Sequence, residues 1–101
     1  MREYLKFYID GQWVDPVEPK TADVINPATE EAMYEVALGS KADLDKAVVA
    51  AKRAFLTYSQ TSREERIALL EKIIEIYKGR MKDIGAAVSD EMGAPLPMAE
   101  K

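Results

Sequence analysis

The pattern of apolar and polar residues changes near residue 40, and the region before it is typical of β-strands. A β-rich run over residues 4–9 leads into Asp10-Gly11, and a second run covers residues 12–14. An Asp-Gly pair between two such runs favours a type I′ turn, in which both central residues take positive φ. The pattern therefore predicts a β-hairpin, which Asp15-Pro16 ends.

A second hairpin is predicted directly downstream. Residues 23–25 form a short apolar run, and residues 33–38 alternate between apolar and polar side chains up to Gly39. Between them, Asn26-Pro27 opens a segment typical of a turn, because Asn-Pro favours turn initiation. We interpret Asn26 as the residue that makes this turn.

From Ser40 onward the apolar residues follow a helical period. Ser40 is a good N-cap, and Asp43 lies three residues later, where a carboxylate favours a helix N-terminus. The pattern predicts a helix over residues 41–57. Its apolar stripe consists of Leu44, Ala47, Val48, Ala51, Phe55 and Tyr58.

Two more helices are predicted. Ser62 and Glu65 form a capping box, and the stripe of the second helix is Ile67, Leu70, Ile74, Tyr77 and Met81. Gly79 is placed as the residue just after this helix. A third helix over residues 81–92 is expected to bury Ile84 and Val88 and to end at Gly93, before Pro95 and Pro97. Residues 94–101 show no usable pattern.

Composition excludes several kinds of chemistry. The 101 residues include 18 acidic and 14 basic side chains, for a net charge of -4, and they contain no cysteine and no histidine. A thiol nucleophile, a disulfide, a zinc site with its usual ligands and a His-based triad are therefore impossible within this chain. Because phosphate contacts need clustered Lys and Arg, the mild acidity also argues against nucleic-acid binding. No apolar run is long enough to span a bilayer, and we expect a cytoplasmic protein.

Few side chains suggest a site of their own. Glu71 and Glu75 share one helix face and would suit acid-base catalysis or metal binding, but a solvated face explains them more simply. Neither Ser59 nor Ser89 has the Asp-Ser-Leu context of an acyl carrier. The aromatic residues of the first hairpin are interpreted as cross-strand packing rather than as a ligand platform.

The order of the motifs resembles the N-terminal segment of the aldehyde dehydrogenase superfamily. Its opening hairpin, Asn-Pro turn, first long helix and next helix all have counterparts in register. The matching residues are Tyr8 to Val14, Val24 to Thr29, Ala42 to Phe55, then Ser62, Arg66 and Leu70, and finally Glu91 and Gly93. The resemblance implies an α+β fragment, with two β-hairpins followed by about three α-helices, of the α/β aldehyde dehydrogenase fold. In it, residues 1–39 form a hairpin region, 40–93 the helical part of a Rossmann-like cofactor domain, and 94–101 a tail.

The resemblance also implies an enzyme that oxidises an aldehyde to an acid with NAD or NADP. In that family a cysteine thiolate attacks the aldehyde, a glutamate activates water, and an asparagine amide helps to form the oxyanion hole. This chain has no cysteine, and its one asparagine belongs to the turn motif. We therefore assign no catalytic and no cofactor-binding residue, and we predict that the 101-residue chain alone is inactive.

One metal site follows from the resemblance. Many family members hold a monovalent cation between the backbone before Asn-Pro and an acidic side chain near the end of the third helix. The matching residues are Val24, Ile25 and Glu91, where several members carry aspartate in place of Glu91. Carbonyl and carboxylate oxygens suit a hard cation.

Two functions remain open at this point. The first is the opening part of an aldehyde dehydrogenase, truncated before its catalytic residues, structural in role and part of a homo-oligomer. The alternative is a free-standing acidic protein-interaction module without enzymatic activity. On either interpretation we expect no nucleic-acid partner and no membrane contact.

Overall fold

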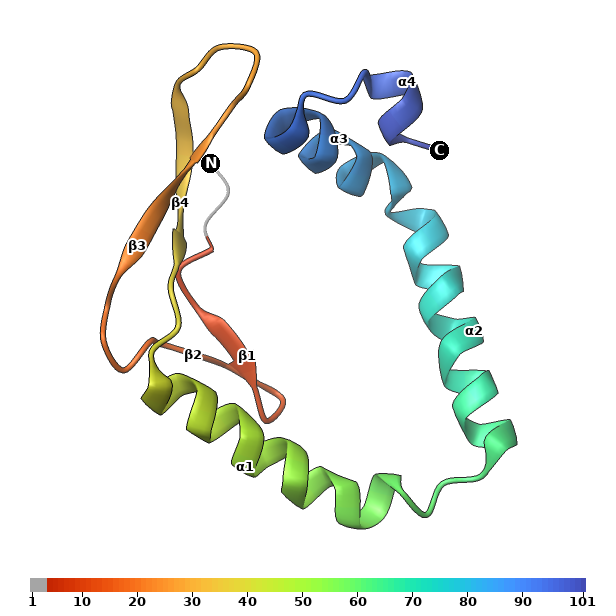
Figure 1. Ribbon diagram of the computed structural model, residues 1–101. Coiled ribbons are helices and arrows are strands. Elements are labelled where there is room, and N and C mark those ends of the chain that lie inside the picture. The colour runs from red at the N-terminus through yellow and green to blue at the C-terminus, as the bar shows by residue number, and fades with distance from the viewer. Residues whose placement is uncertain (1–3) are drawn as a thin grey trace. The chain divides into compact units, whose positions relative to one another are not determined.

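In the computed structural model, which describes residues 4–101, four strands precede four helices (Figure 1). The strands are β1 (Phe7–Ile9), β2 (Gln12–Val14), β3 (Thr21–Ile25) and β4 (Ala32–Ala37). The helices are α1 (Lys41–Tyr58), α2 (Arg63–Gly79), α3 (Met81–Met92) and α4 (Leu96–Ala99). This order confirms the predicted α+β class, with two hairpins ahead of the helices.

The first hairpin has the turn that its sequence predicts. β1 and β2 are antiparallel, with Tyr8 opposite Trp13. Asp10 and Gly11 connect them with φ values of 56° and 74°, so both central residues take the positive φ of a type I′ turn. The rings of Tyr8 and Trp13 lie 5.2 Å apart, which confirms cross-strand aromatic packing.

The second hairpin pairs β3 with β4 in a separate two-stranded sheet. Asn26 builds the turn between them, as expected. Its side-chain oxygen accepts hydrogen bonds from the N–H groups of Ala28, at 2.8 Å, and Thr29, at 3.3 Å. Its own N–H donates to the Glu31 carbonyl at 2.9 Å. These bonds satisfy the turn backbone locally.

A small core forms where the chain before β1 meets β4. The Ala37 N–H donates to the Tyr4 carbonyl at 2.8 Å, and Tyr4 forms a parallel bridge with Val36. The Tyr4 ring lies 5.2 Å from the ring of Tyr34, which is 9% exposed. Among the described residues, Tyr34 is the one large apolar side chain that is buried.

Helices α1 and α2 begin at the predicted caps. Ser40 with Asp43, and Ser62 with Glu65, both form complete capping boxes. The end of α2 differs from the prediction. Gly79 is its last helical residue and has no positive φ, and Arg80 alone separates α2 from α3. Because the chain continues at once into another helix, it needs no left-handed glycine there.

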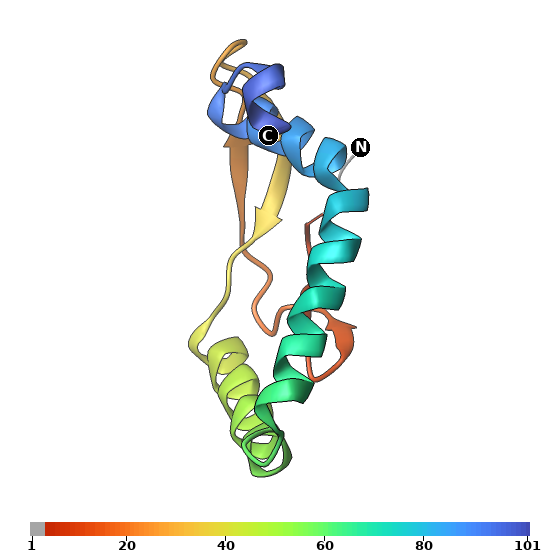
Figure 2. The same cartoon turned by 90° about the vertical axis from the view of Figure 1, so that its right-hand side faces the viewer.

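The bounds of α3 match the prediction, and Gly93 ends it with φ 77°. The tail, in contrast, forms an additional one-turn helix, α4, which the sequence pattern did not predict. Pro97 lies in the first turn of α4, where the fixed φ and missing N–H of proline are compatible with a helix. Both views of the ribbon show α4 folded back on α3 (Figures 1 and 2).

Gly85 makes the α3–α4 contact possible. It is the buried residue of α3. A Cβ atom at this position would lie 2.9 Å from the Ala99 carbonyl oxygen and 3.0 Å from the Cα atom of Glu100. Only glycine lets these two backbones approach so closely.

The chain divides into two compact units that interleave in sequence. The first comprises the chain up to Val24 together with Ala32–Gln60, and the second comprises Ile25–Glu31 and Thr61–Lys101. The second unit therefore contains the Asn26 turn as well as α2, α3 and α4. The predicted division at residues 39 and 93 concerns a whole enzyme and stays a prediction.

Candidate functional site

Asp43 is a buried polar side chain of the first unit, and three hydrogen bonds reach its carboxylate. It is 4% exposed. Its Oδ1 atom accepts a hydrogen bond from the Val17 N–H at 3.0 Å, and its Oδ2 atom accepts from both the N–H and the hydroxyl of Ser40, each at 3.0 Å. One carboxylate thus caps α1 and also fixes the connector between the two hairpins.

These contacts change the titration of Asp43. The hydrogen bond from the Ser40 N–H, followed by the one from the Val17 N–H, lowers the pKa of the Asp43 carboxyl below its usual value. Burial acts in the opposite direction and is outweighed, because donors aimed at a carboxylate favour its charged form. Asp43 is therefore ionised at neutral pH, and its environment makes it a structural anion rather than a proton donor.

The sequence indicated Asp43 only as a helix cap. Its spacing from Ser40 was the signal for that role. No local signal marks Val17, which lies 26 residues away. This contact joins residues that are far apart in the sequence, so only the tertiary structure reveals it.

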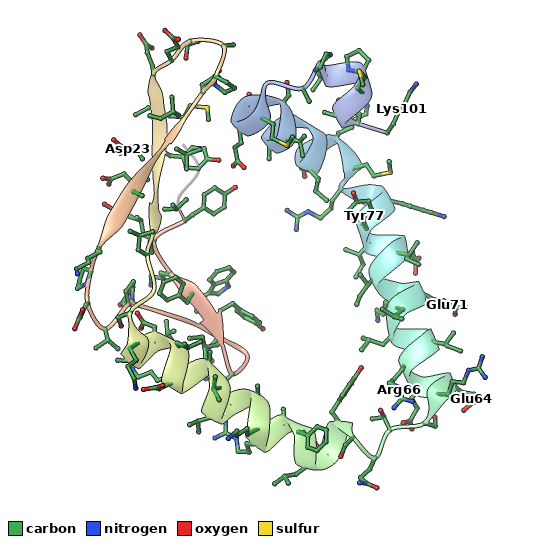
Figure 3. The ribbon with its side chains drawn as sticks, in the orientation of Figure 1. Asp23, Glu64, Arg66, Glu71, Tyr77 and Lys101 are labelled. Atoms are coloured by element: carbon green, nitrogen blue, oxygen red, sulfur yellow. The ribbon has the colours of Figure 1, made fainter. Side chains whose placement is uncertain are left out.

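The acidic pair Glu71 and Glu75 lies on the exposed surface of α2. Glu71 projects from the same side of the helix as Glu64 (Figure 3). Across the part of the chain that the structure describes, no three side chains of the His, Cys, Asp or Glu type come together as a metal site. The arrangement agrees with the simpler interpretation of a solvated face.

The residues predicted to hold a cation lie on β3 and α3. Val24 and Ile25 end β3, and Glu91 is exposed next to the last residue of α3. Ile25 and Glu91 belong to the second unit, whereas Val24 belongs to the first. Within the second unit, the end of α3 meets the Asn-Pro turn, because a Cβ atom on Gly93 would lie 3.1 Å from Pro27 Cγ.

A hollow lies between the first hairpin and α1 in the first unit. A cavity of about 500 Å³ lies between them, and Arg53 on α1 pairs with Asp10 of the hairpin turn beside it. Both side chains of this ion pair are more than half exposed. The cavity is lined by Ile9, Asp10, Gln12, Val14, Asp45, Lys46, Val49, Ala50 and Arg53. Nothing in this lining resembles a nucleophile with its base.

Two helices expose apolar side chains that a complete core would cover. On α1, Leu44 is 62% exposed and Phe55 is 66% exposed. No residue of α2 is buried. The predicted stripes lie on α1 and α2, except that Met81 begins α3. Among the residues that the structure describes, they remain largely uncovered.

Comparison with known proteins gives one consistent result. The model of the aldehyde dehydrogenase family matches residues 13–101. A putative aldehyde dehydrogenase of Staphylococcus aureus is 52% identical over all of this chain, which covers 21% of the relative. An aldehyde dehydrogenase structure from Bartonella henselae is 50% identical with a TM-score of 0.95, covering 98% of this chain and 21% of the other.

A second solved structure shows ligands. It is a mutant of aldehyde dehydrogenase C from Pseudomonas syringae in complex with NAD+ and octanal. It is 46% identical with a TM-score of 0.91, covering 94% of this chain and 20% of that one. This chain thus spans about one fifth of the length of the relatives it matches. The resemblance stated from the sequence is confirmed, and the alternative of a free-standing interaction module finds no support.

Hydropathy adds one finding of its own. Among the described residues, no helix is both long enough and apolar enough to cross a membrane.

Proposed function

We propose, because the chain belongs to the aldehyde dehydrogenase family, that it forms part of the cofactor-binding domain of an enzyme that oxidises an aldehyde to a carboxylic acid. The observation that carries this proposal is the family match over residues 13–101. The related structure with bound NAD+ and octanal supports a nicotinamide cofactor and an aldehyde substrate. The cofactor, NAD or NADP, would accept the hydride.

This segment contributes to the structure of the enzyme and supplies no reacting group. It contains no cysteine, and the family resemblance implies a cysteine thiolate as the nucleophile. Its contribution is a pair of hairpins and two long amphipathic helices, whose caps are complete. We therefore expect the 101-residue chain alone to be inactive.

Two experiments test this function. In the first, the chain is mixed with NAD or NADP and a panel of aldehydes that includes octanal, and the absorbance of the reduced cofactor is followed. Turnover by the chain alone would contradict the structural role.

In the second experiment, a chimera carries this chain in place of the matching segment of the Staphylococcus aureus relative. The chimera should keep NAD-dependent activity within about tenfold of the parent, because one fifth of the fold is replaced by a segment 52% identical to it.

We propose that the backbone carbonyls of Val24 and Ile25 and the carboxylate of Glu91 hold a monovalent cation in the whole enzyme. Oxygen donors of this kind match a hard cation. The close approach of Gly93 to Pro27 supports the proposal, because it brings the end of α3 to the turn that follows Ile25.

Substitution in the chimera tests the cation site. Potassium or sodium chloride should raise its melting temperature more than choline chloride of equal ionic strength. At a concentration ten times the Kd, the stabilisation amounts to about 1.4 kcal/mol. Glu91→Gln should abolish the difference, whereas Asp90→Asn, which removes the same charge one residue earlier, should keep it. Equal behaviour of the two variants would refute the site.

The remaining expectations concern the whole protein. We propose that the whole enzyme is a homo-oligomer, as the family resemblance implies. Light scattering of the chimera tests this. The cytoplasmic location stays a prediction, for which cell fractionation is the measurement.

A further inference from the structure

One half of α2 carries exposed apolar side chains, with Arg63 and Arg66 at its N-terminal end. We call it the α2 apolar face, and its members recur at the spacing that places them on one side of a helix. Their exposed fractions run from 44% at Ile67 to 58% at Leu70. The α2 apolar face consists of Ile67, Leu69, Leu70, Ile73, Ile74, Ile76 and Tyr77.

The opposite half of α2 is fully compatible with water. It carries small or charged side chains. Its members are Glu64, Ala68, Glu71, Lys72, Glu75 and Lys78. Single exposed apolar residues are common on protein surfaces, but seven on one helix face mark a surface that binds apolar structure.

The partner of this face is indicated by the lengths of the related proteins. The chain covers 21% of the Staphylococcus aureus relative and 21% of the Bartonella henselae structure. About four fifths of the family fold is therefore available to cover α2. In the described part of this chain, no element buries any residue of α2.

We propose that the α2 apolar face docks the remaining four fifths of an aldehyde dehydrogenase polypeptide, and that it does so even when that part is a separate chain. This inference rests on the proposed function and extends it to association between two polypeptides. The likeness in backbone to the complete relative, with a TM-score of 0.95, supports docking without extensive reordering. Preformed binding elements lose less conformational entropy on association.

The docking experiment uses a truncated Staphylococcus aureus relative that lacks the segment matching this chain. The 101-residue chain, labelled at its N-terminus, is titrated with the truncated protein, and fluorescence anisotropy reports binding. NAD-dependent oxidation of an aldehyde panel is measured in the same mixtures. We expect saturable binding and an activity that appears only when both polypeptides are present.

A pair of lysine substitutions locates the contact. Ile74→Lys places a charge in the α2 apolar face, and it should weaken binding at least tenfold, because the lysine must be desolvated in an apolar contact. Ala68→Lys adds the same side chain on the opposite half of the helix and should change binding less than twofold. Circular dichroism of both variants shows whether helix content is preserved.

The outcomes separate this inference from the proposed function. Binding that Ile74→Lys and Ala68→Lys weaken equally would overturn the α2 apolar face as the docking surface. Self-association of the chain without binding to the truncated protein would overturn docking, while an active covalent chimera would leave the proposed function intact. If the chimera too is inactive, the proposed function itself fails.

Discussion

The two compact units of this chain are stabilised in different ways. In the first, polar contacts join residues that are distant in sequence, as Asp43 does with Val17 and Ala37 with Tyr4. In the second, α3 and α4 depend on close backbone contact at Gly85, and α2 buries no residue at all. The comparison teaches that capping and turn chemistry can define a helix completely while its packing still depends on a partner.

Substitution of Gly85 should have the largest effect on this comparison. Gly85→Leu forces a side chain against the Ala99 carbonyl, and overpacking of this kind costs about 1–3 kcal/mol. We expect α4 to detach from α3, which hydrogen exchange of Leu96–Ala99 would detect. Gly79→Ala is the control, because no atom lies within 4 Å of its Cβ position. Unchanged protection of α4 in Gly85→Leu would contradict the close contact.

Removal of the Asp43 carboxylate tests the first unit. Asp43→Ala leaves the Val17 and Ser40 N–H groups without their acceptor, so the melting temperature should fall by several degrees and α1 should fray at its start. The control is Asp45→Ala, which removes only an exposed pair with Lys41 worth about 0.3–0.5 kcal/mol. Similar losses from both variants would rule out a special role for Asp43.

Acid should weaken the first unit through the same carboxylate. The pKa of Asp43 is lower in the folded chain than in the unfolded chain. Its stabilisation is therefore present above the unfolded pKa, which is about 3.9, and is lost as the pH falls through the lower folded value. Thermal melts between pH 5 and pH 2, at about 0.1 M salt, should show a smaller loss in Asp43→Asn than in the parent. Identical pH profiles would exclude this contribution.

The turn of the first hairpin should respond more weakly. Gly11 has φ 74° and no atom within 4 Å of its Cβ position, so Gly11→Ala introduces backbone strain without a clash. The expected cost is about 1 kcal/mol. Near-ultraviolet circular dichroism of Trp13 and Tyr8 measures the hairpin. Gly39→Ala, where the contact to Phe7 is an ordinary 3.8 Å, should be close to neutral.

The ion pair between Arg53 and Asp10 should matter least. Its side chains are 60% and 63% exposed, and exposed pairs contribute about 0.2–1 kcal/mol. A double-mutant cycle with Arg53→Ala and Asp10→Asn should give a coupling energy in that range, and 1 M salt should reduce it. A coupling above 2 kcal/mol would show that the pair holds the hairpin against α1.

Much of the local structure could be predicted from short stretches of sequence. Asp10-Gly11 specified its turn, and Ser40 and Ser62 specified where α1 and α2 begin, because the bonds involved close within a few residues. The additional helix α4 and the true end of α2 were missed. Pro97 is compatible with either a loop or a first helical turn, and Gly79 ends α2 without the left-handed conformation. Contacts with neighbouring elements decided that Pro97 lies in a helix and that α2 ends without a left-handed residue.

The candidate site was predictable only in part. The spacing of Asp43 from Ser40 predicted its role as a helix cap. Its hydrogen bond from Val17 could not be predicted, because the sequence around neither residue indicates that the two lie close together. The positions of Val24, Ile25 and Glu91 came from the family resemblance, and their ligand role stays a prediction.

The sequence by itself determined the kinds of elements, their caps and turns, and the family to which the chain belongs. It also determined that the chain has no thiol and no imidazole for catalysis. Only the tertiary structure decided that Asp43 reaches the connector, that α4 rests on Gly85 and that α2 remains uncovered. The physical reason is range: turns and caps are satisfied within a few residues, whereas burial depends on which distant backbone comes near.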